Sequence, residues 1–241
     1  MPPTADSTDI LIRSGDRWAK TLSLPVLRIV SILMAVLALA GFGLIAEQVW
    51  QLKTLPLDRA ILLALRSRHS PLLDQIMWGI TFLGEPKVLL VLCSGVGIGL
   101  WQVRQRREAG MLAIATFGAI GLNYVLKHLF SRPRPHLWER LVKVDTYSFP
   151  SGHAMLSIAF YCVLGYLLTN YFPRWRVLTI SLTVMLIAAI GFSRLYLGVH
   201  WPSDVVAGYA VSFVWLVACI LMLEGWQHYR SSQEVGDDGK S

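Results

Sequence analysis

The chain has 241 residues, of which 54% are hydrophobic and only 15% are charged, and its net charge is +7. Since soluble proteins contain about 25% charged residues, this composition excludes an ordinary soluble domain and indicates a single integral membrane domain. The positive charge does not indicate a nucleic-acid-binding protein, because the basic residues gather in short loops between apolar stretches. In such loops they suit an anionic lipid surface and an anionic substrate.

The N-terminal part of the chain predicts a cytoplasmic segment, a first span and a surface segment. Residues 1–23 are polar, and residues 24–47 are apolar and long enough to cross a hydrocarbon core of about 30 Å. We expect an uncleaved helix, because the apolar region of a signal peptide has only about 7–15 residues. Residues 57–83 predict amphipathic helices on the membrane surface, broken at Ser70-Pro71, which either gate substrate entry or form a cover without chemistry.

Five further apolar stretches follow, at residues 87–102, 110–130, 152–170, 176–195 and 203–223. The sequence therefore predicts an all-α polytopic membrane protein with six transmembrane helices and the surface segment between the first two. Residues 24–224 would form this membrane domain, and residues 225–241 a disordered cytoplasmic tail. Basic residues in the loops modestly favour cytoplasmic termini, and the loop 104–107 is the strongest indication of this orientation.

Charged and polar residues gather at three predicted helix ends, which alternating spans place on the face opposite the termini. The first group is Lys127–Pro135, with the spacing Lys-x6-Arg-Pro, and the second is Pro150-Ser151-Gly152-His153. The third runs from Ser193 to Asp204, with the spacing Ser-Arg-x5-His-x3-Asp. Because charged side chains are costly in a membrane protein, they indicate a functional site.

The basic residues of these motifs suit an anionic ligand. Arg134 and Arg194 offer planar guanidinium groups that bind phosphate oxygens in pairs, and Lys127 adds a point charge. Ser151 and Gly152 precede or open a helix, where a hydroxyl group, free backbone N–H groups and the helix dipole favour an anion.

The histidines suit nucleophilic displacement with general acid catalysis. His200 and Asp204 are four residues apart, so the carboxylate can contact one ring nitrogen, fix the tautomer and leave the other nitrogen free to attack. His153 would lie at the rim of the same anion site. The other arginines of this region, Arg132 and Arg140, are expected to contact a lid or lipid headgroups.

The three motifs, complete and in this order, resemble the type-2 phosphatidic acid phosphatase family, whose fold is shared with vanadium haloperoxidases; the match covers residues 58–224. The resemblance implies that His200 attacks phosphorus to give a phosphohistidine, that Asp204 orients and stabilises this intermediate, and that His153 protonates the leaving oxygen. It implies that the phosphoryl oxygens are held by Lys127, Arg134, Ser151, Gly152 and Arg194. No metal and no cofactor are implied, because the cationic side chains take that place.

The resemblance implies a lipid phosphatase of the inner (plasma) membrane with an extracytoplasmic active site. The implied substrates are undecaprenyl diphosphate, phosphatidylglycerophosphate or phosphatidate, and the partners are lipids, with no nucleic acid and no obligate protein. A broad-specificity phosphatase or phosphotransferase of the same family stays open. A transporter or channel is disfavoured, because the middle of each span is almost wholly apolar. A haloperoxidase lacks support from any halide-specific feature, and the complete motifs disfavour an inactive scaffold.

Overall fold

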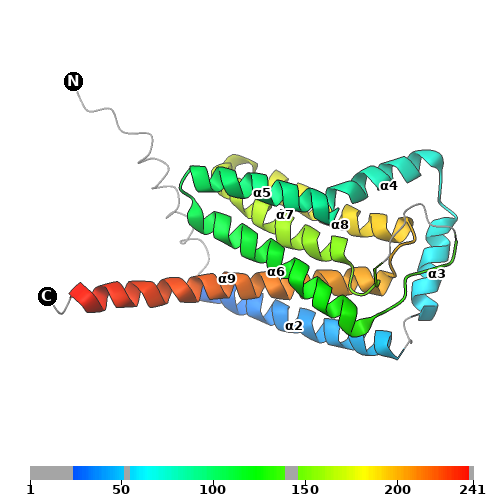
Figure 1. Cartoon of the computed structure of the whole chain (residues 1–241), viewed down its shortest axis with the longest axis horizontal. Coiled ribbons are helices and arrows are strands. Elements are labelled where there is room, and N and C mark those ends of the chain that lie inside the picture. Colours follow the sequence, from blue (N-terminus) through cyan, green and yellow to red (C-terminus); the bar gives the residue numbers. More distant parts are fainter. Residues whose placement is uncertain (1–23, 52–54, 139–145, 239–241) are drawn as a thin grey trace, which may run out of the picture.

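The computed structural model describes residues 24–51, 55–138 and 146–238, and within these ranges every regular element is a helix. The helices in chain order are α2 (Leu24–Trp50), α3 (Leu55–Arg66), α4 (Pro71–Leu83), α5 (Pro86–Gln102), α6 (Arg106–Phe130), α7 (Gly152–Tyr171), the short η2 (Pro173–Trp175), α8 (Arg176–Tyr196) and α9 (Pro202–Asp238). The long helices run side by side as a bundle, whereas α3 lies across one end of it (Figure 1). The predicted all-α fold is confirmed.

Helix α7 is the centre of the bundle. It contacts α5, α6, α8 and α9, and 61% of its most apolar window is buried, compared with 6% for α2. Its side chains Met155 and Phe160 pack into the main apolar core with Leu89 of α5 and Leu112 of α6. A helix that is apolar on all sides suits a protein core or a membrane span, and the four neighbours of α7 hold the helix that carries the Ser-Gly-His motif in place.

The outer helices expose apolar side chains that suit a bilayer. Leu37 and Leu44 of α2 and Val177 and Met185 of α8 are all more than half exposed. Five helices are long and apolar enough to cross a membrane, and the pair α4 and α5, bent by 45°, makes a sixth if it is one span. Helix α5, which we expected to span alone, has 17 residues and reaches about 25 Å. The chain is therefore a multi-pass membrane protein with five membrane-capable helices among the described residues, and α5 counts as part of a sixth span only if it crosses together with α4.

Helix α9 extends further than the sequence predicted. The last span was expected to end at residue 223 and to be followed by a disordered tail, but α9 is helical to Asp238, and its distal part reaches beyond the bundle (Figure 1). The expectation of disorder depended on polarity alone, whereas no proline follows residue 225 to end the helix. The expected cytoplasmic segment, residues 1–23, lies outside the described residues.

Helices α3 and α4 form the predicted surface segment. On α3, Leu57 is 69% exposed while Leu62 is fully buried, so one face of this helix packs on the bundle and the other does not. Ser70 caps α4 by accepting a hydrogen bond from the N–H of Leu73, and a proline follows at the first helical position. Tyr196, at the end of α8, anchors this turn, because its hydroxyl donates to Asp74 over 2.8 Å and accepts from the N–H of Ser70.

Candidate active site

The three motifs meet at the end of the bundle that carries α3. One lies at the end of α6 and in the loop after it, the second opens α7, and the third joins α8 to α9. Six of the eight predicted site residues line one cavity of about 620 Å³, namely Lys127, Arg134, Gly152, His153, Arg194 and His200. The other two, Ser151 and Asp204, are fully buried, and the N–H of Ser151 donates to the carbonyl oxygen of Asp204 over 3.0 Å. The structure therefore brings all eight residues together.

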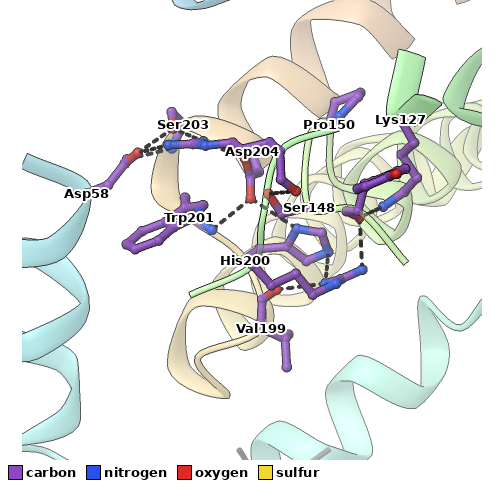
Figure 2. A network of polar contacts seen from close by, with 12 residues as sticks. Asp58, Lys127, Ser148, Pro150, Val199, His200, Trp201, Ser203 and Asp204 are labelled. Carbon is purple, nitrogen blue, oxygen red and sulfur yellow. Dashed lines mark hydrogen bonds and ion pairs between the residues drawn. The ribbon is translucent and has the colours of Figure 1, made fainter. Parts of the chain in front are cut away.

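His200 is held between a carboxylate and a guanidinium group (Figure 2). Its Nδ1 lies 3.3 Å from Oδ2 of Asp204, and its Nε2 lies 3.1 Å from Nη1 of Arg134. Because a guanidinium group only donates hydrogen bonds, Nε2 must accept, and in the neutral ring Nδ1 then carries the proton and donates it to Asp204. The geometry thus selects the tautomer in which Nε2 has a lone pair.

His200 is also kept neutral. It lies between the two candidate spans α8 and α9 and is only 1% exposed. Burial disfavours the charged imidazolium ring, and Arg134, Arg194, Lys127 and a protonated His153 would repel it. These causes hold the pKa of His200 well below its usual value of 6.5. A neutral imidazole is the form that can act as a nucleophile.

Asp204 occupies the first turn of α9 and is fixed by several donors. Its Oδ1 accepts from Nη1 of Arg132 over 2.6 Å, and its Oδ2 accepts from the backbone N–H of Trp201 over 2.9 Å. A carboxylate in the first turn also interacts favourably with the helix dipole. The orientation of Asp204 toward His200 is therefore set by contacts on both of its oxygen atoms.

Two of the three predicted cations, Lys127 and Arg134, donate hydrogen bonds to backbone carbonyl groups. Lys127 donates to the carbonyl oxygen of Tyr147. Arg134 donates from Nε to the carbonyl oxygen of Thr146 over 2.6 Å and from Nη1 to that of Val199 over 2.7 Å. These hydrogen bonds to backbone carbonyl groups place both cationic side chains at the cavity, where they favour an anion.

Arg194 approaches the cavity from α8 and is 3% exposed. Its Nη1 donates to the hydroxyl of Thr81 on α4, so the surface segment helps to place a predicted phosphate-binding residue. Its Nε is buried and has no hydrogen-bond partner within the described residues. A buried donor without a partner is costly, and an oxygen of a bound anion in the adjoining cavity would satisfy it.

The start of α7 forms a second part of the anion site. The side-chain amide of Asn123 donates to the carbonyl oxygen of Pro150 over 3.1 Å and fixes the turn. A Cβ at Gly152 would lie 3.0 Å from Oδ1 of this asparagine, so glycine permits the close approach. The hydroxyl of Ser151 is buried without a hydrogen-bond partner in the part of the chain that the structure describes. A free hydroxyl at a helix N-terminus suits a phosphate oxygen.

His153 faces a carboxylate that the sequence motifs did not include. Its Nε2 lies 3.2 Å from Oε2 of Glu85, which belongs to the turn between α4 and α5 and also lines the cavity. A carboxylate at this distance can orient the imidazole ring. No motif pointed to this contact, because Glu85 lies outside the three groups of charged and polar residues.

Arg132, which we expected to contact a lid or lipid headgroups, contacts the surface segment through α3 and also reaches the His200–Asp204 pair. It is 3% exposed and forms ion pairs with Asp204, over 2.6 Å, and with Asp58 of α3, over 2.7 Å. Its guanidinium carbon also lies 5.5 Å from the centre of the Trp201 ring. The sequence could not show this role, since Asp58 is 74 residues away in a helix predicted only from its apolar pattern.

The cavity has an apolar side as well as a cationic one. Trp78 and Phe82 of α4 and Tyr124 of α6 line it, and each of them is more than half exposed on the outside of the bundle. The cavity thus continues from the cations to a surface that suits lipid tails. Among the described residues, no group of three His, Cys, Asp or Glu side chains is arranged to hold a metal ion.

Comparison with known proteins gives concordant results. The sequence profile of the PAP2 superfamily matches residues 108–227. Phosphatidylglycerophosphatase B of Bacillus subtilis (strain 168) is 34% identical over 161 residues, which cover 65% of this chain and 78% of the relative. A putative undecaprenyl-diphosphatase of Escherichia coli (strain K12) is 28% identical over 162 residues, which cover 64% and 77%.

The fold is also similar to a solved structure. The crystal structure of a transmembrane PAP2-type phosphatidylglycerolphosphate phosphatase from Bacillus subtilis aligns with a TM-score of 0.73 and 27% sequence identity. The alignment covers 81% of this chain and 96% of that chain, so nearly the whole solved protein has a counterpart here.

Proposed function

Because this chain belongs to the PAP2 superfamily, we propose that it is a membrane lipid phosphatase that hydrolyses phosphate or diphosphate esters of lipids. One observation carries this proposal: a single cavity joins a cluster of cations and two histidines to an apolar side that opens on the outside of the bundle. The cationic side suits a phosphate, and the apolar side suits the chain attached to it.

The bound phosphate would be held by charge and by hydrogen bonds. Arg134, Arg194 and Lys127 are placed to donate to its oxygen atoms. The Ser151 hydroxyl and the backbone N–H groups at the start of α7, which Gly152 leaves accessible, complete the site. This arrangement favours the transition state, because the donors are already oriented before charge develops on the phosphoryl oxygens.

In the first step, Nε2 of His200 attacks phosphorus, and an N–P bond forms as the P–O bond to the lipid breaks. The electron pair of that bond leaves on the lipid oxygen, and a protonated His153 supplies its proton. His200 keeps the proton on Nδ1, so the phosphohistidine ring carries positive charge, which Asp204 stabilises at 3.3 Å. The products of this step are a lipid alcohol, or a lipid monophosphate from a diphosphate, and a phosphoenzyme.

In the second step, His153 is neutral and acts as the base. It accepts a proton from a water molecule whose oxygen attacks phosphorus, the N–P bond breaks, and its electron pair returns to Nε2 of His200. Inorganic phosphate leaves, and both histidines regain their starting protonation states. No step transfers electrons to an oxidant or requires a metal ion.

The position of the cavity supports a substrate that stays in the bilayer. Trp78 and Phe82 on α4 and Tyr124 on α6 line the cavity and are also exposed, so lipid chains can remain outside while the phosphate enters. The arginine-containing loop between α5 and α6 lies at the opposite end of the bundle from the cavity. Since such loops favour the cytoplasm, we propose that the cavity faces the extracytoplasmic side of the inner (plasma) membrane.

Small exposed headgroups fit this cavity best. The relatives are named as phosphatases of phosphatidylglycerophosphate and undecaprenyl diphosphate, and both substrates present a terminal phosphate on a long chain. A volume of about 620 Å³ accommodates one phosphate or diphosphate with its first carbons. We therefore place these two lipids and phosphatidate ahead of substrates with a bulky sugar headgroup.

The test is phosphate release by the purified protein from long-chain and short-chain versions of one ester in mixed micelles. Binding of the remote chain should raise kcat/KM for the long version. Equal kcat/KM for short soluble esters would contradict the lipid assignment and leave a broad-specificity phosphatase. No release from any ester would contradict the phosphatase assignment itself.

A further inference from the structure

A buried row of ionic contacts connects the surface helix α3 to His200 (Figure 2). Oδ2 of Asp58 lies 2.7 Å from Nη2 of Arg132, and Nη1 of the same arginine lies 2.6 Å from Oδ1 of Asp204. Ser203 braces the row, since its N–H and its hydroxyl donate to Asp58 over 3.0 and 2.6 Å. His200 contacts the other oxygen of Asp204.

The three charged members of this row are almost completely excluded from solvent, with exposures of 3% for Asp58, 3% for Arg132 and 0% for Asp204. Burying an ion is costly unless it is paired, and Arg132 with Asp204 alone would already form a neutral pair. A second buried carboxylate therefore requires an explanation. The row as a whole carries one net negative charge, and this charge adjoins His200.

We propose that Asp58 and Arg132 are positioning residues of phosphoryl transfer: Arg132 fixes the Asp204 carboxylate, and Asp58 offsets the charge of Arg132 so that the row stays negative toward His200. This inference rests on the proposed function, because it assigns the two residues to the step in which His200 attacks phosphorus. Neither residue touches the substrate, and both act through Asp204.

The reason lies in the charge that develops on His200. When Nε2 binds phosphorus, the ring becomes positive while its Nδ1 proton stays directed at Asp204. Arg134, Arg194 and Lys127 already oppose positive charge on this ring. One net negative charge behind Nδ1 compensates for it more strongly than a neutral Arg132–Asp204 pair would. The compensation is needed in the transition state and much less in the complex with bound substrate.

The row also gives α3 a function. Its buried face presents Asp58 to Arg132 and Ser203, while Leu57 beside it is exposed. The seating of the surface helix and the orientation of the His200–Asp204 pair therefore depend on the same contacts. The predicted segment 57–83 therefore covers the bundle and also helps to orient the His200–Asp204 pair.

The test compares Asp58→Asn with Asp74→Asn. Both substitutions remove one carboxylate charge from the surface segment, but Asp74 contacts Tyr196 and His69 rather than the row. D58N should lower kcat by about 10–100-fold, the range found for residues that orient catalytic metal ligands, with little change in KM. D74N should retain kcat within about threefold, and Asp58→Glu should recover part of the lost rate by restoring the charge.

Inhibition separates positioning from general structural damage. Vanadate resembles the pentacoordinate transition state, and inorganic phosphate resembles the ground state. In D58N, vanadate inhibition should weaken in proportion to kcat/KM, while phosphate inhibition should change less than about threefold. If D58N does not fold, D58E is used in its place. Because the longer side chain displaces the carboxylate, vanadate inhibition should again weaken more than phosphate inhibition.

Two outcomes would overturn the inference: D58N with the kcat of D74N, or vanadate and phosphate inhibition that weaken equally. A wild-type protein without activity on any lipid phosphate would instead contradict the proposed function. An active wild type in which D58N matches D74N would contradict only the role of Asp58 and Arg132.

Discussion

Arg134 donates to Nε2 of His200 over 3.1 Å, so a cation proposed to bind the phosphate already holds the atom proposed to attack it. This hydrogen bond occupies the lone pair of the nucleophile. A phosphate that enters the cavity competes for the guanidinium group, because charge-assisted bonds are stronger than bonds to a neutral acceptor. Binding of the substrate phosphate would therefore also release Nε2 of His200 from Arg134.

His153 should matter most when the leaving group is poor. A lipid alkoxide needs a proton as the P–O bond breaks, so His153→Ala should lower turnover of alkyl phosphates by about 10²–10⁴-fold, the usual contribution of a general acid. An aryl phosphate with an acidic leaving group should lose much less in its first step. Pre-steady-state release of the alcohol from both ester types measures this difference. Equal losses for the two esters would argue against the acid role.

The pH dependence of kcat/KM should show that His200 becomes protonated only below its usual pKa of 6.5. Because the pKa of His200 lies well below 6.5, the acid limb of kcat/KM should fall below pH 6.5 after correction for ionisation of the substrate near pH 6. The sign follows from the mechanism, since protonation of Nε2 removes the lone pair and activity is lost as the pH falls through this pKa. A bound anion should raise the pKa, so the acid limb of kcat should lie at higher pH. An acid limb of kcat/KM above pH 6.5 would contradict this account.

The orientation in the membrane can be tested with single cysteines in a background without Cys93, Cys162 and Cys219. His136 is exposed at the cavity end and Val103 is exposed in the loop at the other end. In intact cells, His136→Cys should react with an impermeant thiol reagent and Val103→Cys should react only after lysis. The reverse pattern would place the cavity on the cytoplasmic side.

Removal of divalent metals should leave activity intact. Three cationic side chains and the start of α7 surround the proposed phosphate position, and they supply the charge stabilisation that a metal ion gives in many phosphatases. Release of phosphate should therefore be the same in EDTA and in buffer, with vanadate as a positive control for inhibition. A loss in EDTA that Mg²⁺ restores would contradict the proposed mechanism.

The positions of most helices and the meeting of the three motifs could be predicted from the sequence. Apolar stretches of sufficient length gave the spans, and their alternation placed Lys127, His153 and His200 at one end of the bundle. All three line the cavity. The catalytic and binding roles of these residues stay predictions.

Other features could not be predicted, because they depend on contacts between distant residues. Glu85 faces His153 only because α4 and α5 meet at a bend of 45°. Asp58 reaches Arg132 only because α3 turns its polar edge toward the bundle. Helix α9 is longer than predicted. Polar residues beyond the apolar part favoured disorder, but helix-compatible residues continue to Asp238.

The most direct test of the account is the identification of the phosphoenzyme. His153→Ala, given an aryl phosphate with a labelled phosphoryl group, should form the intermediate readily but hydrolyse it slowly, because the base of the second step is missing. Rapid quenching under alkaline conditions, which preserve phosphohistidine, followed by peptide mapping should place the label on His200, and His200→Ala in the same background should carry none. Label on another residue, or turnover retained by His200→Ala, would contradict the central claim that His200 is the nucleophile.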